Sequence, residues 1–364
     1  MTVVDSPLDA AEELSGRLFM DALGGFHLLT VYLGHRLGLF RALADRPETS
    51  VDELAAAAAL DARYVREWVQ AEVIAGLIQA SDEDLTVATL RLSPGVVEVL
   101  VTETHPEYLA GLGYALASVG RVLPDLVGAF RTGAGVPYEA YGDDGIEAQS
   151  ALNRPAFVND LASHWIPAIP GVDERLRDAS RPARVADVGS GVGWAAIELA
   201  RAFPNARVDG IDLDTRSIAA AKANSIEAGV ADRALFRVAD AARGGLASGR
   251  YDLVLFLESL HDMAHPVDAL AAARTAVVDG GAVVVMDERA GVVRPAAGDP
   301  IETFFGTIST LWCLPQARVD PESESPGTVM RPQVLESIAR RAGWAGIETL
   351  PIDHPFWRFY RLAA

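Results

Sequence analysis

The sequence contains one cysteine, Cys313, and this scarcity excludes two kinds of site. A lone thiol cannot form a disulfide within the chain, and it cannot build a metal centre that needs several cysteines. We therefore expect Cys313 to be a small buried apolar residue, and we expect no bound metal ion.

Basic residues are also few, because 31 Lys and Arg stand against 50 Asp and Glu, for a net charge of −19 and a pI near 4.7. Nucleic acids and anionic membranes are both bound through Lys and Arg, so this balance argues against either partner. A cationic ligand suits it better, although net charge concerns steering and solubility and not the fold.

Long apolar runs and a leader are missing too. No segment approaches the roughly 18 apolar residues of a membrane span. The start, MTVVDSPLDAAEEL, lacks the basic and apolar regions of a secretory signal. These features predict a cytoplasmic protein, and a chain of 364 residues with 50% hydrophobic content is long enough for about two domains.

Three regions of the chain differ in composition and in the pattern of their apolar residues. Residues 1–100 are Leu- and Ala-rich and helical. Residues 101–180 mix apolar helices with turns rich in Gly, Pro and Tyr, and predict a helical linker that also contributes to a substrate pocket. Residues 181–364 alternate short apolar strands with helices, which is typical of an α/β fold with a doubly wound sheet.

The first region resembles a winged helix. Ser50 and Glu53 have the spacing of a capping box before a short helix. A second helix is expected over about 62–75, and residues 77–93 read as a two-stranded wing. Between positions 41 and 91 five basic residues face ten acidic ones, a net of −5. This charge favours packing and dimerisation over DNA recognition.

The helix before the winged region carries apolar residues near one face: Leu14, Leu18, Ala22 and Phe26. That face predicts a dimer surface, with core packing inside one chain as the alternative.

The most informative segment is RVADVGSGVGW. A strand over 184–188 leads into a helix over 195–202, and the turn between them carries Gly189, Gly191 and Gly193. Glycine lets the backbone turn sharply and approach a ligand, and the helix start offers unpaired N–H groups.

The glycine spacing does not fit a dinucleotide site, because Trp194 stands where the third glycine of G-x-G-x-x-G would be. The segment is also too short for a phosphate-binding P-loop and lacks its lysine. Asp187 would repel a pyrophosphate, but its carboxylate can accept hydrogen bonds from an ammonium group. S-adenosylmethionine carries an ammonium and a sulfonium, so it fits this loop better than NAD.

Further carboxylates end the next three predicted strands: Asp212 in RVDGID, Asp240 in ALFRVAD and Glu258 in YDLVLFLES. Asp212 can pair with both ribose hydroxyls, and Asp240 can accept from an adenine amino group. Each residue alone is also explained as a solvated loop residue or a helix cap. In this order they point to one ligand at the carboxyl edge of the sheet.

Residues 181–290 resemble the core of class I S-adenosylmethionine-dependent methyltransferases. The resemblance implies a seven-stranded Rossmann-like sheet with an antiparallel last strand, in which GAVVVMDE, GIETLPI and FWRFYRL are the fifth, sixth and seventh strands. It implies methionine contacts from the glycine turn, ribose contacts from Asp212 and adenine contacts from Asp240 and Ala241. The full set of predicted cofactor-binding residues is Asp187, Gly189, Ser190, Gly191, Gly193, Asp212, Leu213, Asp240, Ala241 and Glu258.

The whole chain also resembles a bacterial subgroup of this family with an N-terminal winged helix. The segments that carry this likeness are GVPYEAY, LASHWIPAIPGVDERL, SLHDMAHP and TISTLWCLPQA. More distantly, the chain is similar to plant-type small-molecule O-methyltransferases, which place a winged dimerisation domain before the same core. The resemblance implies a homodimer, a small-molecule acceptor and S-adenosylhomocysteine as product.

His261 and Asp262 follow the fourth predicted strand. In the resembling O-methyltransferases a His at this point is the general base for a phenolic hydroxyl, and Asp262 would orient the imidazole. A His near its ordinary pKa can take a proton at neutral pH. The sequence departs from the family at Met263, where an aromatic residue is usual. The alternatives are a buried His that caps the next helix, and transfer that needs only positioning.

An inserted helix near 290–330 is predicted to cover the acceptor as a lid, with ordinary core packing as the alternative. Asp299 and Pro300 mark its start. The candidate substrate residues from this and two earlier segments are Tyr138, Tyr141, His164, Trp165, Phe305 and Trp312.

The sequence therefore predicts methyl transfer from S-adenosylmethionine to a small, hydrophobic or aromatic acceptor, with oxygen as the expected acceptor atom and nitrogen next. Two alternatives stay open. One is a protein of the same fold that does not transfer methyl, of the decarboxylase, hydroxylase or pericyclase type. The other is a cofactor-binding transcriptional regulator.

Overall fold

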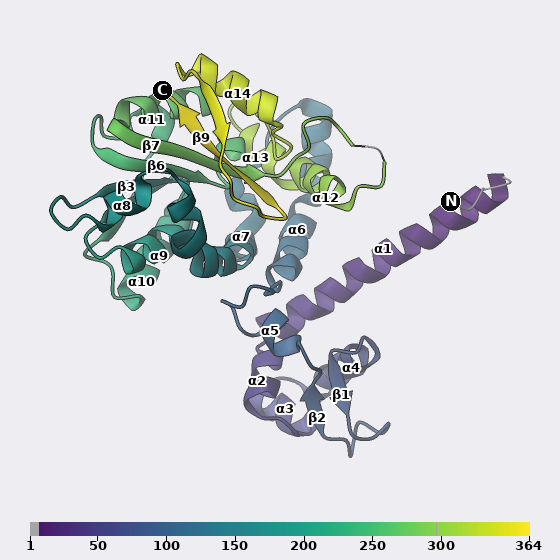
Figure 1. The fold of residues 1–364 in the computed structure, drawn as a ribbon. Coiled ribbons are helices and arrows are strands. Elements are labelled where there is room, and N and C mark those ends of the chain that lie inside the picture. Colours follow the sequence, from purple (N-terminus) through teal and green to yellow (C-terminus); the bar gives the residue numbers. More distant parts are fainter. Residues whose placement is uncertain (1–6, 296) are drawn as a thin grey trace. The chain divides into compact units, whose positions relative to one another are not determined.

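A computed structural model describes residues 7–295 and 297–364 (Figure 1). The chain divides into two compact units, Met1–Gly120 with Glu147–Pro155, and Arg121–Ile146 with Ala156–Ala364. Within the described residues no helix is both long enough and apolar enough to cross a membrane.

The first unit contains the predicted winged helix. Its elements are α1 (Pro7–Arg36), α2 (Leu39–Asp45), α3 (Val51–Ala58), α4 (Ala62–Ile74), β1 (Ile78–Ala80), β2 (Leu90–Leu92) and α5 (Val96–Leu100). The capping box is present, because the Ser50 side chain accepts from the Glu53 N–H while the Ser50 N–H donates to the Glu53 carboxylate at 2.8 Å. β1 and β2 pair antiparallel, as the wing requires.

Two helices contribute residues to both units: α6 (Gly111–Thr132) and α7 (Gly142–Ala156). The second unit therefore takes part of the segment between the winged helix and the sheet. Short elements of that part are η1 (Tyr138–Tyr141), the π-helical η2 (Phe157–Trp165), η3 (Ile166–Ala168) and α8 (Val172–Arg177).

The second unit is built on a seven-stranded sheet with the order β5-β4-β3-β6-β7-β9-β8. The strands are β3 (Arg184–Val188), β4 (Arg207–Asp212), β5 (Ala234–Val238), β6 (Tyr251–Leu257), β7 (Val277–Glu288), β8 (Gly346–Thr349) and β9 (Trp357–Ala363). Neighbours from β5 to β7 are parallel, whereas β9 pairs antiparallel with both β7 and β8. The predicted seven-stranded sheet with an antiparallel last strand is thus confirmed.

Helices cover both faces of this sheet (Figure 1). The further elements are α9 (Trp194–Ala202), α10 (Thr215–Glu227), η4 (Ala241–Arg243), η5 (Leu260–Asp262), α11 (Pro266–Ala276), α12 (Pro300–Ile308), the π-helical η6 (Ser309–Cys313), α13 (Leu314–Ala317) and α14 (Pro332–Arg341). Alternate residues of β6 show the two cores. Leu253 packs with residues of α8 and α9, whereas Val254 packs with α11 and α14. Coverage of both faces explains why residues 253–257 of β6 form an unbroken apolar run.

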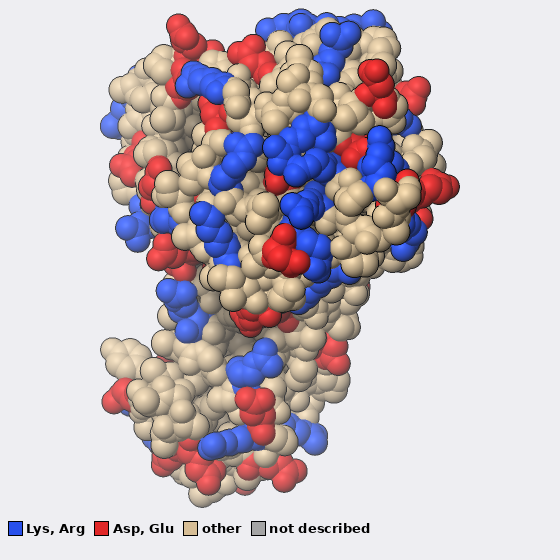
Figure 2. Space-filling view, turned by 90° about the vertical axis from the view of Figure 1, so that its left-hand side faces the viewer, with Lys and Arg blue, Asp and Glu red and all other residues tan. Residues whose placement is uncertain are grey.

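The surface does not carry one sign of charge throughout. Figure 2 shows basic and acidic side chains interspersed on one face of the molecule. The net charge of −19 is therefore no guide to the ligand of a particular site, and any preference for a cation has to be argued from local, buried carboxylates.

Candidate functional site

The glycine turn joins β3 to α9 at the carboxyl edge of the sheet. Gly189, Gly191 and Gly193 have positive φ angles of 76°, 51° and 88°, a region that other residues adopt at a cost. A Cβ on Gly189 would also lie 2.4 Å from the Cβ of Ser259. The turn therefore depends on glycine both for its backbone conformation and for its close approach to the segment after β6.

Asp187 and Ser190 place polar atoms in this turn that the protein itself does not satisfy. The Asp187 side chain is 2% exposed, and its Oδ2 has no hydrogen-bond partner among the described residues. The same holds for the Ser190 hydroxyl. Burial raises the pKa of Asp187 to about 7, with a further contribution from Asp212. A buried acceptor without a partner is costly, and a cationic ligand with N–H donors would remove that cost.

Asp212 ends β4 and fixes the turn from the other side. Its carboxylate accepts the Gly191 N–H and the Asp214 N–H, both at 2.8 Å. Burial raises its pKa. A carboxylate has about four acceptor positions, so two remain for hydroxyl donors of a ligand. Leu213, next along the chain, is 68% exposed at this edge.

Asp240 follows β5 and caps η4 through a 2.8 Å bond from the Ala242 N–H. Ala241 beside it is buried. Since β5, β4, β3 and β6 are neighbours in the sheet, the predicted cofactor residues from 187 to 241 lie along one carboxyl edge. That edge is where ligands bind in open α/β sheets, and strand order reverses there at β3.

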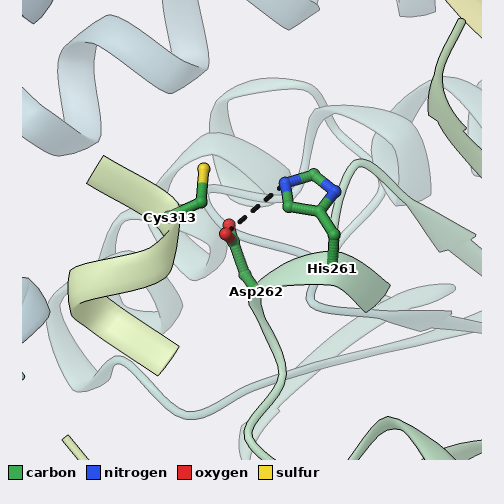
Figure 3. A group of neighbouring side chains, drawn as sticks. All are labelled: His261, Asp262 and Cys313. Carbon is green, nitrogen blue, oxygen red and sulfur yellow. Dashed lines mark ion pairs between the residues drawn. The ribbon is translucent and has the colours of Figure 1, made fainter. Parts of the chain in front are cut away.

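His261 lies in η5 and is 2% exposed. Its Nδ1 lies 3.1 Å from both carboxylate oxygens of Asp287 and 3.3 Å from Oε2 of Glu288. Its Nε2 lies 3.4 Å from Oδ1 of Asp262, on the side where Cys313 approaches (Figure 3). One ring nitrogen is thus held by the strand end of β7, and the other faces Asp262 and η6.

The carboxylates decide the charge of this imidazole. Burial by itself lowers the pKa of His261, but Glu288, Asp287 and Asp262 outweigh it and raise the pKa well above its ordinary value. The carboxylates therefore favour the imidazolium form of His261. That form can serve as a base only after it has lost a proton.

Glu258 was predicted to bind the cofactor, and the structure places it beside the His261 group. Burial raises its pKa to about 8, and His261, Asp287 and Asp262 also act on it. Its φ of 55° is unusual for a residue other than glycine. Asp287 and Glu288 are functional candidates that the sequence analysis missed, although the end of the strand GAVVVMDE marked their position.

Two groups here have metal-type donor atoms within 4.8 Å of one another: His261, Asp262 and Cys313, and His261, Asp287 and Glu288. A metal needs a neutral imidazole, whereas the surrounding carboxylates favour the imidazolium form. Among the described residues His261 is instead ion-paired with Asp262, Asp287 and Glu288, and Asp262 Oδ1 and Glu288 Oε2 have no hydrogen-bond partner.

The inserted helix begins as predicted, because the Asp299 side chain accepts the Glu302 N–H at 2.9 Å. Phe305 and Trp312 of this segment are buried. Tyr141 is fully buried, donates its hydroxyl to the Leu311 carbonyl at 2.8 Å and lies against the Trp312 ring at 4.8 Å between centroids. The rings of Tyr141 and Trp312 thus form an apolar wall next to Cys313.

The other candidate substrate residues lie elsewhere. Trp165 packs in the core against Phe359, with 4.8 Å between ring centroids, and the exposed His164 pairs with Asp160. Neither joins the group around Trp312, because η2 turns them toward the sheet and the solvent. Tyr138 lies near Arg216, with the guanidinium 5.9 Å from the ring centroid.

Two family models match the chain. Residues 185–281 match a model described as a methyltransferase domain, and residues 25–93 match a Rv2258c-like winged HTH domain. The matched ranges coincide with the cofactor edge of the sheet and with the winged helix of the first unit.

Curated relatives assign the family. A ubiquinone biosynthesis O-methyltransferase of Cupriavidus pinatubonensis is 32% identical over 207 residues, which are 57% of this chain and 75% of the relative. The corresponding protein of Ralstonia nicotianae is 31% identical over 160 residues, which span 44% of this chain and 62% of the relative's length. The chain belongs to the class I S-adenosylmethionine-dependent methyltransferases, and the orphaned polar atoms of the glycine turn fit that cofactor.

Solved structures share the fold along the whole chain. LaPhzM has a TM-score of 0.71 at 18% identity, covering 96% of this chain and 99% of that one. The mitomycin 7-O-methyltransferase MmcR has a TM-score of 0.69 at 19% identity, covering 97% and 99%. Human N-acetylserotonin methyltransferase in complex with S-adenosylmethionine has a TM-score of 0.66 at 19% identity and is covered in full, as is this chain. At these identities the likeness is one of fold.

The buried charge of Asp187 leads to a first prediction. Asp187→Asn should weaken S-adenosylhomocysteine binding at least about tenfold, which is about 1.4 kcal/mol, because the acceptor for the ligand ammonium is lost. It should also stabilise the ligand-free protein by about 1–3 kcal/mol at pH 8. The raised pKa of Asp187 means that the wild type loses stability as pH rises through about 7, and the variant lacks that loss.

Calorimetry and urea unfolding at pH 5 and pH 8 measure both effects. Asp232→Asn, at an exposed position paired with Arg233, is the matched control and should change neither. An Asp187→Asn protein that binds as tightly as the wild type would contradict the assignment.

Proposed function

We propose that the protein transfers a methyl group from S-adenosylmethionine to a hydroxyl oxygen of a small, hydrophobic or aromatic acceptor. The observation that carries this proposal is the juxtaposition of two groups. The carboxyl edge with Asp187 and Asp212 suits the cofactor, and the His261 cluster next to it is covered by the apolar wall of Tyr141 and Trp312.

S-adenosylmethionine supplies an electrophilic methyl group on its sulfonium sulfur. In this proposal the 189–193 turn and Asp187 hold the amino-acid end, and Asp212 accepts from the ribose hydroxyls. Asp240 and Ala241 border the adenine. Phe305, Trp312 and Tyr141 exclude water from the acceptor, which strengthens every charge interaction at the site.

His261 is the proposed proton acceptor. Asp287 and Glu288 hold its Nδ1, so Nε2 faces Asp262 and the lid, where the acceptor hydroxyl would donate. Nε2 would take the proton of the acceptor hydroxyl while that oxygen displaces the sulfonium sulfur from the methyl carbon, so that the carbon–sulfur bond breaks and S-adenosylhomocysteine leaves as the thioether. The raised pKa favours the protonated ring, and it makes the neutral ring a stronger base once the proton has left.

A panel assay tests the reaction. Incubation with S-adenosylmethionine and a set of phenols and amines should yield S-adenosylhomocysteine and a methylated phenol. Formation from amines only would move the acceptor atom to nitrogen. Tight S-adenosylhomocysteine binding without turnover of any member would favour the non-transferring alternative and count against the proposal.

The charge cluster predicts the pH dependence of this reaction. The rate should be low in acid and rise with pH through neutrality, because His261 must lose a proton first. The midpoint of this rise, the acid limb of the profile, should lie above the ordinary pKa of His. Asp287→Asn should move the limb to lower pH, since removal of a carboxylate lowers the pKa of His261. His261→Ala should reduce kcat by about 10²–10⁴-fold.

Rate profiles from pH 5 to 10 measure the limb. His105→Ala in the first unit is the control and should keep the wild-type profile. A His261→Ala enzyme with an unchanged profile would remove the base assignment and leave the cofactor assignment intact.

We also propose that the protein is a homodimer formed through α1. This helix runs for 30 residues, and residues 8–24 are exposed. Its exposed large apolar residues are Leu8, Leu14, Leu18, Phe19, Met20, Leu23 and Phe26. Contiguous apolar surface of this kind is rare on a monomer, and a second copy of the same helix offers a complementary apolar face.

Charge on this helix should therefore disrupt assembly. The double variant Phe19→Asp, Phe26→Asp should sediment as a monomer. Each new carboxylate would be an unpaired charge buried in the interface, which is costly. Val87→Asp in the wing, also at an exposed apolar position, is the control and should stay dimeric. A wild-type monomer at micromolar concentration would refute the proposal.

A further inference from the structure

The segment over 133–143 is bound to the lid at several points. The Val136 N–H donates to the Pro315 carbonyl at 2.9 Å, and Arg318 donates to the Gly133 carbonyl at 3.0 Å. At Gly135 the backbone passes so close that a Cβ would lie 2.2 Å from the Val319 nitrogen. Together with the Tyr141 contacts, these interactions make the segment and residues 311–319 one packed unit.

Arg216 joins the same segment to residues 212–216. These residues form the corner of the sheet edge that contains Asp212, the proposed ribose ligand. Arg216 lies in the first turn of α10, 3.4 Å from Oδ1 of Asp214 and 3.5 Å from Oδ1 of Asp143. Its guanidinium also lies over the Tyr138 ring. Asp214 in turn donates its N–H to Asp212, the proposed ribose ligand.

The far end of the lid touches the proposed proton acceptor. The Cys313 sulfur, the Asp262 carboxylate and a His261 ring nitrogen lie within 4.8 Å of one another (Figure 3). An unbroken series of contacts therefore runs from Asp212 through Arg216 and the 133–143 segment to the lid and the His261 group. All of these residues belong to the second unit.

We propose that Arg216 is a positioning residue that couples occupancy of the cofactor site to closure of the lid over the acceptor. The proposal rests on the cofactor site of the proposed function. Ribose contacts at Asp212 immobilise the 212–216 corner, and Arg216 then holds Tyr138 and Asp143 in the arrangement that packs 133–143 against the lid. The acceptor pocket is complete only when the cofactor is bound.

Arg216 has a further property that suits this role. Its Nη2 is buried and has no hydrogen-bond partner in the described part of the chain. An unsatisfied guanidinium nitrogen is costly when buried, so the packed arrangement of this corner carries a cost that ribose contacts at Asp212 would offset. A ligand that makes those contacts only in the packed arrangement supplies the differential interaction that a population shift requires.

Coupling of this kind is reciprocal, so it is measurable without knowledge of the acceptor. Hydrogen exchange of the wild type is compared with and without saturating S-adenosylhomocysteine. Exchange in 133–141 and 309–319 should slow by at least about fivefold, the lower end of typical coupling factors. In Arg216→Ala the ligand should still bind, with protection of the 189–193 turn, while the lid segments slow by less than about twofold.

Two further variants sharpen the test. Arg201→Ala removes an arginine that pairs with Glu198 on α9, outside the series of contacts, and should behave as the wild type. Gly135→Ala separates the segment from the lid sterically, so it should also lose lid protection while the turn stays protected. Calorimetry gives the S-adenosylhomocysteine concentration that saturates each variant.

The outcomes separate the two proposals. If S-adenosylhomocysteine does not bind to the wild type, both the cofactor assignment and the coupling are overturned. If it binds and protects the turn but not the lid, the coupling alone is wrong. Equal lid protection in Arg216→Ala and the wild type would likewise overturn the role of Arg216.

Discussion

The constraint on which the site depends is the balance of buried charge around one imidazole. Glu258, Asp262, Asp287 and Glu288 surround His261, and no arginine or lysine is ion-paired with any of them in the described chain. Negative charge of this kind is stable inside a protein only with protons or a cation nearby. The imidazolium supplies part of the compensation, and a sulfonium at the adjacent edge would supply more.

The same balance concerns the proposed cofactor edge and the proposed proton acceptor, which lie on neighbouring strands. Parallel strands end at the same edge, so β3, β4, β6 and β7 bring Asp187, Asp212, Glu258 and Asp287 to one side of the sheet. Asp212 adds to the raised pKa of Asp187, and Asp287 adds to the raised pKa of Glu258. A cationic cofactor lowers that mutual repulsion, and transfer of its methyl group removes the positive charge again, which favours release of the neutral thioether product.

The sequence predicted the features that are local to one turn or one strand. The left-handed glycines, the capping box at Ser50, and Asp187 and Asp212 at strand ends each follow from a few adjacent residues. Glu288 and the place of Trp165 could not be predicted in that way. The first depends on β7 lying beside β6, and the second on a π-helical turn that directs the indole into the core. Both are consequences of packing between distant segments.

The lid matters for the same electrostatic reason. A base with a raised pKa is effective only if water does not compete for its proton and if the acceptor reaches it already oriented. Tyr141 and Trp312 close the apolar wall, and Cys313, whose own pKa is raised to about 12 by burial, adds no charge to the cluster. A permanently closed wall would block entry of the acceptor, whereas a permanently open one would hydrate His261. The proposed closure of the lid in response to the cofactor would satisfy both demands, because the charge cluster would be sealed only when the methyl donor is in place.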